Sequence, residues 1–259
     1  MRLPLHPLAA SHYWNKYFVR ADKMHIMDLK GLTAIAGGSI MHYLVKNNNT
    51  MGRVEALRVQ ELNRVLRKFQ SDTKAEHRMP DIRIQDLTNS GGWTVLCGQV
   101  VKAANTRCLV PFFKHLAIEY FSGHGEYNSS VRKVCYNLDE IETILYTSDM
   151  FLDDAALQRL DQCFRVLARH WQHLRFLSKR DYQNRWQITP KVHYSLHLPY
   201  QARLINLRFV QNYAEEGLIG RLTRMWGKSA NGAYELVAQF TVLARYFVGL
   251  ELRMTSPFY

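Results

Sequence analysis

The stretch from Asp153 to Leu177 limits the fold most strongly, because its apolar residues recur every three to four positions. This spacing places them on one face of an α-helix and does not fit the alternation of a strand. The residues that form the stripe are Ala156, Leu160, Phe164, Leu167, Trp171 and Leu174. Asp153 and Asp154 precede the stripe and favour a helix N-terminus, where carboxylates accept hydrogen bonds from unpaired backbone N–H groups. The stretch therefore predicts one long helix with a buried face.

A second amphipathic helix is predicted from Arg53 to Gln70. Its apolar stripe consists of Val54, Leu57, Leu62, Val65, Leu66 and Phe69, and its other faces carry Arg53, Arg58, Arg64, Arg67 and Lys68. Such a run of cations is either a solvated helix face or a surface that contacts phosphates. The sequence is compatible with both interpretations.

The rest of the chain predicts a mainly α protein, a helical bundle-like domain with at most a few short strands. Further helices are expected over Leu29–Lys46, Thr94–Phe121 with a junction at Pro111, Ser130–Tyr146, Phe209–Trp226 and Ala233–Arg253. Ile82 and Ile84 alternate with polar residues and indicate one short strand or an extended segment. Gly37 and Gly38 would permit close packing within the first of these helices. We expect one domain over 1–259, divisible into sub-regions 1–78, 79–186 and 187–259.

The charge of the chain favours a polyanionic partner. Its 34 lysines and arginines exceed its 22 acidic residues and give a net charge of +12. Nucleic acid is the first candidate, DNA before RNA, and a basic protein packed inside a larger assembly is the alternative. No apolar run reaches the roughly 18–20 residues that cross a bilayer, so we expect no membrane partner. Pro4 and Pro7 interrupt any signal-peptide core, and the four cysteines contain no C-x-x-C pair, so an intracellular protein with reduced thiols is expected.

Two histidine pairs stand at helical spacing. Thr189 and Pro190 predict a helix start, which places His193 and His197 on one face, and Pro199 should break that helix. His170 and His173 lie in the long helix described first. The first pair resembles a metal-binding H-x-x-x-H in spacing, but no Glu follows His193 as in metalloproteases. Packed or hydrogen-bonded histidines are the preferred interpretation of both pairs. Nucleophile-elbow, Walker A and dinucleotide-binding motifs are absent.

An acidic pair, Glu215 and Glu216, lies among Arg208, Arg221 and Arg224. Carboxylates close to arginines are either neutralised by the guanidinium groups or available for a metal ion and a phosphate. The sequence alone leaves these two roles open.

Three short motifs resemble the CACTA-related group of DDE transposases, which use an RNase H-like catalytic fold. Asp22-Lys23-Met24-His25, followed by Leu29 and Gly31, is similar to the family's D-x-M-H element. The segment Pro190-Lys191-Val192-His193, with Leu196, His197, Pro199 and Gln201, resembles the segment before the last catalytic acid. Glu216 with Gly220 and Leu222 resembles the E-x-x-x-G helix that carries this acid, and Lys102–Phe112 is similar to part of the family's helical insertion.

The resemblance implies site residues. Glu216, with Glu215 as the alternative, would be the last catalytic acid and a Mg²⁺ ligand, while Asp22 and His25 would support the motif. Nucleic-acid contacts are expected from Arg53, Arg58, Arg64, Arg67, Lys68, Lys191, Arg221 and Arg224. In the family the first two catalytic aspartates lie upstream of the D-x-M-H element. One glutamate cannot hold the two Mg²⁺ ions of such a mechanism.

These expectations give three hypotheses about function. The first is a nuclear, transposase-derived protein or fragment that binds nucleic acid and is catalytically incomplete alone. The second is a Mg²⁺-dependent DNA nuclease or strand transferase that combines Glu216 with Asp22 and Asp28. The third is a basic structural or adaptor protein in a larger assembly.

Overall fold

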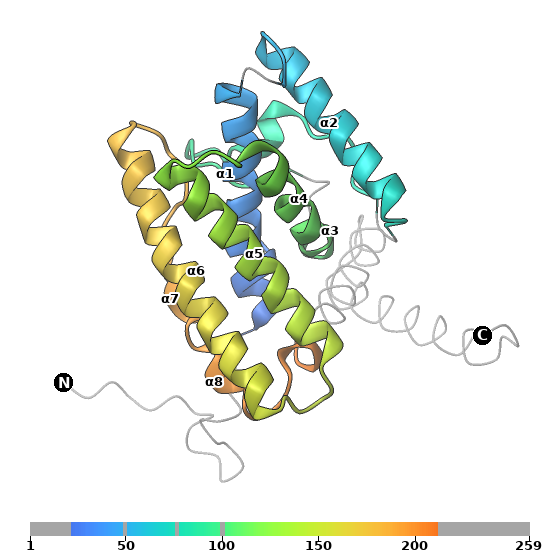
Figure 1. Cartoon of the computed structure of the whole chain (residues 1–259), viewed down its shortest axis with the longest axis vertical. Coiled ribbons are helices and arrows are strands. Elements are labelled where there is room, and N and C mark those ends of the chain that lie inside the picture. Colours follow the sequence, from blue (N-terminus) through green and yellow to red (C-terminus); the bar gives the residue numbers. More distant parts are fainter. Residues whose placement is uncertain (1–21, 49–50, 76–77, 99–101, 212–259) are drawn as a thin grey trace, which may run out of the picture. The chain divides into compact units, whose positions relative to one another are not determined.

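The computed structural model describes residues 22–48, 51–75, 78–98 and 102–211, all within the first of two units, Met1–Gln211. These residues are mainly helical, as predicted, and the β pairing among them is limited to an isolated bridge between Thr88 and Thr94. The elements in chain order (Figure 1) are η3 (Met24–Asp28), α1 (Leu32–Asn47), α2 (Glu55–Asp72), η5 (Ile84–Leu87), α3 (Ala103–Cys108), α4 (Val110–Tyr120), α5 (Glu126–Thr147), α6 (Asp154–Arg180), α7 (Pro190–Ser195), α8 (Leu198–Ala202) and η6 (Leu207–Phe209). None of the described helices is both long enough and apolar enough to cross a bilayer.

The longest helices, α5 and α6, pack side by side as a hairpin (Figure 1). Asp153 accepts a hydrogen bond from the Ala156 backbone N–H at 2.7 Å, which confirms the predicted N-cap of α6. The predicted stripe is buried from Leu160 to Leu174, and only Ala156 is half-buried. The apolar period of this stretch therefore identified both the helix and its inward face.

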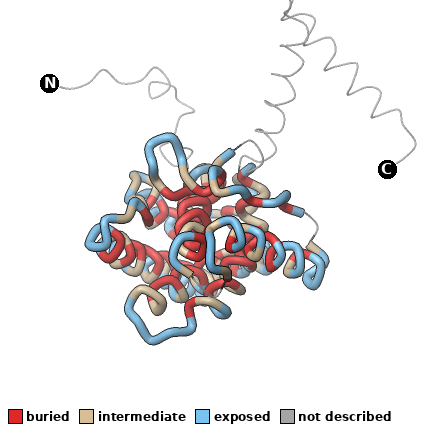
Figure 2. The backbone as a smooth tube through the Cα atoms, turned by 90° about the horizontal axis from the view of Figure 1, so that it is seen from above, coloured by how far each residue is buried: buried red, intermediate tan, exposed pale blue. Residues whose placement is uncertain are grey.

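Most residues of helix α1 are buried. Figure 2 shows the buried residues gathered at the centre of the described part of the chain, with exposed residues around them. A Cβ atom at Gly38 would lie 2.5 Å from the Val95 backbone, and one at Gly37 would lie 2.4 Å from the Phe113 ring. Both distances are far below van der Waals contact. The prediction that these glycines permit close packing is confirmed.

Two tryptophans fix the chain where it leaves α6. Trp171 and Trp186 meet edge to face with centroids 5.2 Å apart, a favourable aromatic geometry. The Trp186 backbone N–H donates to the Ser39 hydroxyl at 3.0 Å, and the Trp171 indole N–H donates to the Gln187 carbonyl at 3.2 Å. The segment leading to α7 is thereby tied to both α1 and α6.

Of the two alternatives predicted around Ile82 and Ile84, the strand is wrong: residues 78–83 form no regular element, Arg83 is extended, and Ile84 begins η5. The Asn63 side chain accepts from the Ile82 N–H at 2.8 Å and donates to the Ile82 carbonyl at 2.9 Å, so both polar groups are already used. Asp86 then accepts from the Arg83 N–H at 3.0 Å, and this capping stabilises the 3-10 turn η5. Side-chain hydrogen bonds thus replaced the strand ladder that the alternation suggested.

The helix predicted over Thr94–Phe121 is too long at its start. Residues 94–98 are not helical, since Val95 and Leu96 donate backbone hydrogen bonds to Leu87 and Ala34. The predicted junction near Pro111 is confirmed, because Leu109 separates α3 from α4. Pro199 lies in the first turn of α8, where its missing N–H removes no helical hydrogen bond.

Candidate nucleic-acid interface

Arg58, one of the predicted phosphate contacts on α2, is buried inside the fold. Its guanidinium donates to the carbonyls of Gly52 at 2.8 Å, Lys46 at 2.8 Å, Val45 at 3.1 Å and Arg53 at 3.2 Å. These acceptors include the end of α1, where helical carbonyls lack intrahelical partners. Arg58 therefore holds α1 and α2 together and does not face a ligand.

The other predicted cations of this region are exposed, namely Arg64, Arg67 and Lys68 on α2 and Arg53 just before it. Arg64 makes a two-bond contact with Glu61, at 2.6 and 2.7 Å, and this hydrogen bond raises the pKa of Arg64. Arg67 pairs with Asp81 at 3.2 Å. Over its whole length α2 carries four cations and three carboxylates, a net charge of +1. Much of its positive charge is therefore already balanced.

Helix α6 carries more positive charge than α2. It contains six lysines and arginines and two aspartates, a net charge of +4. Arg159 pairs with Glu140, and Arg180 pairs with Asp181 at 3.3 Å. Arg169 and Lys179 also belong to α6. No carboxylate of the residues that the structure describes lies within ion-pair distance of either side chain. This helix is the most basic of the longer elements described.

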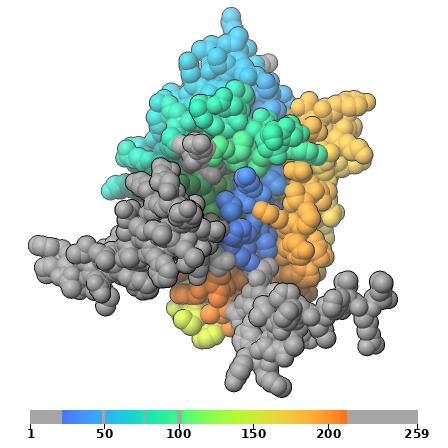
Figure 3. Space-filling view, turned by 180° about the vertical axis from the view of Figure 1, so that it is seen from behind, coloured from blue at the N-terminus to red at the C-terminus, as the bar shows by residue number. Residues whose placement is uncertain are grey.

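A groove runs between α6 and the α7–α8 segment. It consists of two adjoining cavities of about 490 and 500 Å³, which share Asp161 and Tyr200. In the space-filling view of Figure 3, the C-terminal part of α6 (yellow) and the α7–α8 segment (orange) form adjoining surface. The charged, histidine and tyrosine side chains that line the groove are Asp154, Asp161, Arg165, Arg169, His193, His197, Tyr200 and Arg203.

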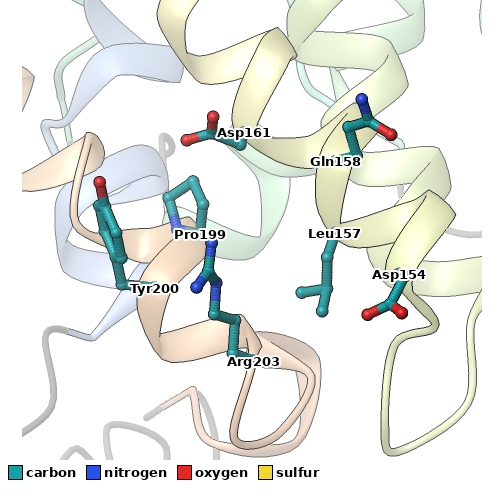
Figure 4. A pocket seen from close by; sticks show the side chains of 7 residues that line it. All are labelled: Asp154, Leu157, Gln158, Asp161, Pro199, Tyr200 and Arg203. Carbon is teal, nitrogen blue, oxygen red and sulfur yellow. The ribbon is translucent and has the colours of Figure 1, made fainter.

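The groove combines cations with an aromatic ring. Figure 4 shows Tyr200 and Arg203 on α8 and its C-terminus, facing Asp161 and Leu157 of α6 across the first cavity. The Arg203 guanidinium lies 5.5 Å from the centre of the Tyr200 ring. Arg165 donates to Asp161 at 2.6 Å, and this contact contributes most to raising the pKa of Arg165.

The charges of the groove are unevenly distributed along its length. Asp154 and Asp161 line the cavity near α8, whereas Arg165 and Arg169 line the cavity near α7 together with Asp161. Guanidinium groups attract phosphates, and an exposed aromatic ring can stack on a base. The end near α7 is therefore the better site for a nucleic-acid backbone.

The four predicted histidines fall into two different environments. His170 is half-buried and lies 3.2 Å from the Ser130 hydroxyl, and burial, followed by the nearby Lys133, lowers the pKa of His170. Its prediction as a hydrogen-bonded histidine is confirmed. His193 and His197 are exposed in the groove, with their Nε2 atoms 3.1 Å apart. They are within hydrogen-bond distance of each other but are not packed in the core.

Lys191, another predicted nucleic-acid contact, connects α7 to the segment that follows η3. Its Nζ donates to the Leu29 carbonyl at 2.8 Å and to the Lys30 carbonyl at 3.4 Å. Burial and the neighbouring Lys30 lower the pKa of Lys191. The motif around Pro190 and the D-x-M-H element are thus in direct contact, although they are far apart in sequence.

The D-x-M-H element forms a network of polar contacts around a buried lysine. Asp22 contacts the His25 ring and accepts from the Met24 N–H at 3.1 Å. Lys23 is buried between Asp28, at 3.1 Å, and Glu142, at 2.5 Å. Burial disfavours the charge of Lys23, but the two carboxylates outweigh it and raise its pKa.

The predicted set of metal ligands lies only partly within the described ranges. The Asp28 carboxylate holds the ammonium of Lys23, and the part of the chain that the structure describes contains no cluster of three or more His, Cys, Asp or Glu side chains suited to a metal ion. Glu215, Glu216, Arg221 and Arg224 lie outside the described residues. The Mg²⁺ site expected at Glu216 therefore stays a prediction.

The sequence analysis missed the groove residues Arg165, Arg169, Tyr200 and Arg203. A signal was present, because Arg165 and Arg169 lie one turn apart on the side of α6 opposite its apolar stripe. The packing of α8 against α6, which brings in Tyr200 and Arg203, could not be read from spacing alone.

Comparisons of the chain with protein-family models, with curated proteins and with solved structures found no match. The resemblance to DDE transposases therefore depends on the three motifs themselves.

Proposed function

We propose that this protein is a transposase-derived nucleic-acid-binding protein that contacts its ligand along α6 and the groove between α6 and α7–α8. DNA is the proposed ligand, with RNA as the alternative, and a DNA ligand implies a nuclear protein. The observation that carries the proposal is the net charge of +4 on α6 beside a groove lined by Arg165, Arg169 and Arg203. Support also comes from the net charge of +12 of the whole chain.

Phosphate neutralisation explains why this arrangement suits nucleic acid. Each phosphate contact releases a bound counterion, so affinity falls with salt, with a slope of about −0.9 per contact for duplex DNA and about −0.7 for single strands. Three groove arginines would account for a slope of about −2 to −3. Tyr200 adds a ring on which an unpaired base can stack.

The proposal is tested by fluorescence anisotropy with labelled duplex DNA, single-stranded DNA and RNA over a range of salt concentrations. The groove variant combines Arg165→Ala, Arg169→Ala and Arg203→Ala. The matched control combines Arg64→Ala, Arg67→Ala and Lys68→Ala on α2, and therefore changes the net charge by the same amount. We expect the groove variant to weaken binding and to lower the salt slope by about 2 to 3. The α2 variant should change both quantities less.

Two outcomes contradict the proposal. One is the absence of binding to all three ligands at low salt. The other is an equal loss in the two triple variants, which would mean that net charge alone, and not the groove, determines binding. Stable co-purification with a protein assembly, without binding of free nucleic acid, would favour the adaptor hypothesis.

The nuclease hypothesis needs a separate experiment. Asp28 would have to release Lys23 before its carboxylate could bind a metal ion, which would leave a buried ammonium without one of its partners. A Mg²⁺-dependent nicking assay that compares the wild type with Glu216→Gln tests this hypothesis directly. Equal activity of both proteins would remove Glu216 from any catalytic role.

A further inference from the structure

The exposed histidine pair of the groove has a geometry suited to binding a metal ion. His193 belongs to α7 and His197 follows it by one turn. Their Nε2 atoms are 3.1 Å apart, their ring centroids are 4.8 Å apart, and the rings are inclined at 77°. The two Nε2 atoms are therefore closer together than the ring centres, so both rings direct the edge that carries Nε2 toward a common point.

The distance between the nitrogens matches that of two imidazoles on one metal ion. Zinc–nitrogen bonds are about 2.0–2.1 Å long, and an N–Zn–N angle between a right angle and the tetrahedral angle separates the nitrogens by about 2.9–3.4 Å. We propose that His193 and His197 form a two-imidazole site for a borderline divalent transition-metal cation such as Cu²⁺, Ni²⁺ or Zn²⁺. Imidazole suits these ions, whereas Mg²⁺ and Ca²⁺ select oxygen ligands.

The fold holds the backbone of this pair in place without the metal. Val192 and Ser195 are buried on the inner side of α7, and the Ser195 hydroxyl donates to the Val192 carbonyl at 2.7 Å. Lys191 ties the same helix to Leu29. Because the two imidazoles already converge, binding requires little further ordering of the chain.

The surroundings of the pair limit its affinity. Arg165 and Arg169 line the same cavity of about 500 Å³, and their positive charge opposes a bound cation. Asp161 also lines it, but its carboxylate accepts from Arg165. Within the described ranges the site therefore has two protein ligands, and water or an exogenous ligand would fill the remaining positions. This proposal does not depend on nucleic-acid binding, because it concerns the metal alone.

The test is isothermal titration calorimetry of the full chain with CuCl₂, NiCl₂, ZnCl₂ and MgCl₂ in separate experiments. We expect one Cu²⁺ to bind most tightly, Ni²⁺ and Zn²⁺ to bind less tightly, and Mg²⁺ to bind elsewhere or not at all. His193→Ala and His197→Ala should each weaken Cu²⁺ binding by about tenfold or more, as expected when one of two ligands is lost. His170→Ala is the matched control, since His170 belongs to the other pair and contacts Ser130 instead.

Electron paramagnetic resonance of the Cu²⁺ complex gives a second readout that folding defects do not imitate. The wild type should show hyperfine coupling to two nitrogens, and each single variant should show coupling to one. Affinity should also fall at acid pH, because protons compete for the imidazole nitrogens. Unchanged Cu²⁺ affinity in both His193→Ala and His197→Ala would overturn the proposal and leave the contact as an N–H···N hydrogen bond only.

Discussion

Helices α2 and α6 are both amphipathic and both carry arginines, yet these arginines have different roles. On α2, Arg58 is buried among backbone carbonyls, Arg64 pairs with Glu61 and Arg67 pairs with Asp81. On α6, Arg165 pairs with Asp161, but both Arg165 and Arg169 line an open groove, and the helix has four more cations than carboxylates. The comparison shows that the number of cations on a helix does not indicate how many of them are free to bind a ligand.

The difference has a local cause in each helix. Glu61 stands three residues before Arg64, a spacing at which side chains of a helix meet. Arg58 points toward the end of α1, where unpaired carbonyls attract a donor. On α6, Asp161 stands four residues before Arg165 and pairs with it, whereas Arg169 has no carboxylate within ion-pair distance in the described part of the chain.

Replacement of Arg58 should have the largest effect, and the effect should be on stability. Arg58→Ala leaves several carbonyls at the α1–α2 junction without their donor, so the free energy of unfolding should fall by about 2–4 kcal/mol. Arg64→Ala, which removes only an exposed ion pair, should have a clearly smaller effect. Urea denaturation followed by circular dichroism measures both. Similar losses in the two variants would mean that Arg58 is no more structural than its neighbours.

A single charge reversal on each helix tests where the ligand binds. Arg169 and Lys68 are both exposed, and neither has a carboxylate within ion-pair distance in the described part of the chain. Arg169→Glu should weaken DNA binding by about tenfold, equivalent to about 1.4 kcal/mol, because it repels a neighbouring phosphate. Lys68→Glu should have a clearly smaller effect in the same anisotropy assay. The reverse order would move the binding surface to α2.

The sequence predicted the helices better than the site. The stripe from Leu160 to Leu174 identified α6 and its buried side, because burial of one helix face imposes the apolar period directly. The strand at Ile82 was wrong because a side chain 19 residues earlier, Asn63, takes both of its backbone groups. The groove depends on how α8 packs against α6, and that is a tertiary contact without a local pattern. Arg58 was misassigned for the same reason.

Acid should lower the free energy of unfolding more through His42 on α1 than through His170 on α6. Burial, followed by the charges of Arg185 and Lys46, lowers the pKa of His42 on α1 to about 4. The unfolded chain takes up this proton near pH 6.5, so stability is fully present above that pH and is lost as the pH falls toward 4. Since His42 is only half-buried, we expect a loss of about 1 kcal/mol. Urea denaturation of His42→Gln at pH 7 and pH 5 should show a smaller pH dependence than the wild type, and His170→Gln on α6 should change it less.

The smallest effect should come from releasing one arginine on each helix from its acidic partner. Asp81→Asn frees Arg67 on α2, and Asp161→Asn frees Arg165 in the groove, with the same change in net charge. Because both pairs are exposed, stability should change little in each variant. DNA affinity should rise about twofold in Asp161→Asn, where the freed guanidinium already faces the ligand, and less in Asp81→Asn. An equal rise in both would show that the nucleic acid responds to total charge, and the distinction between α2 and α6 would then concern folding alone.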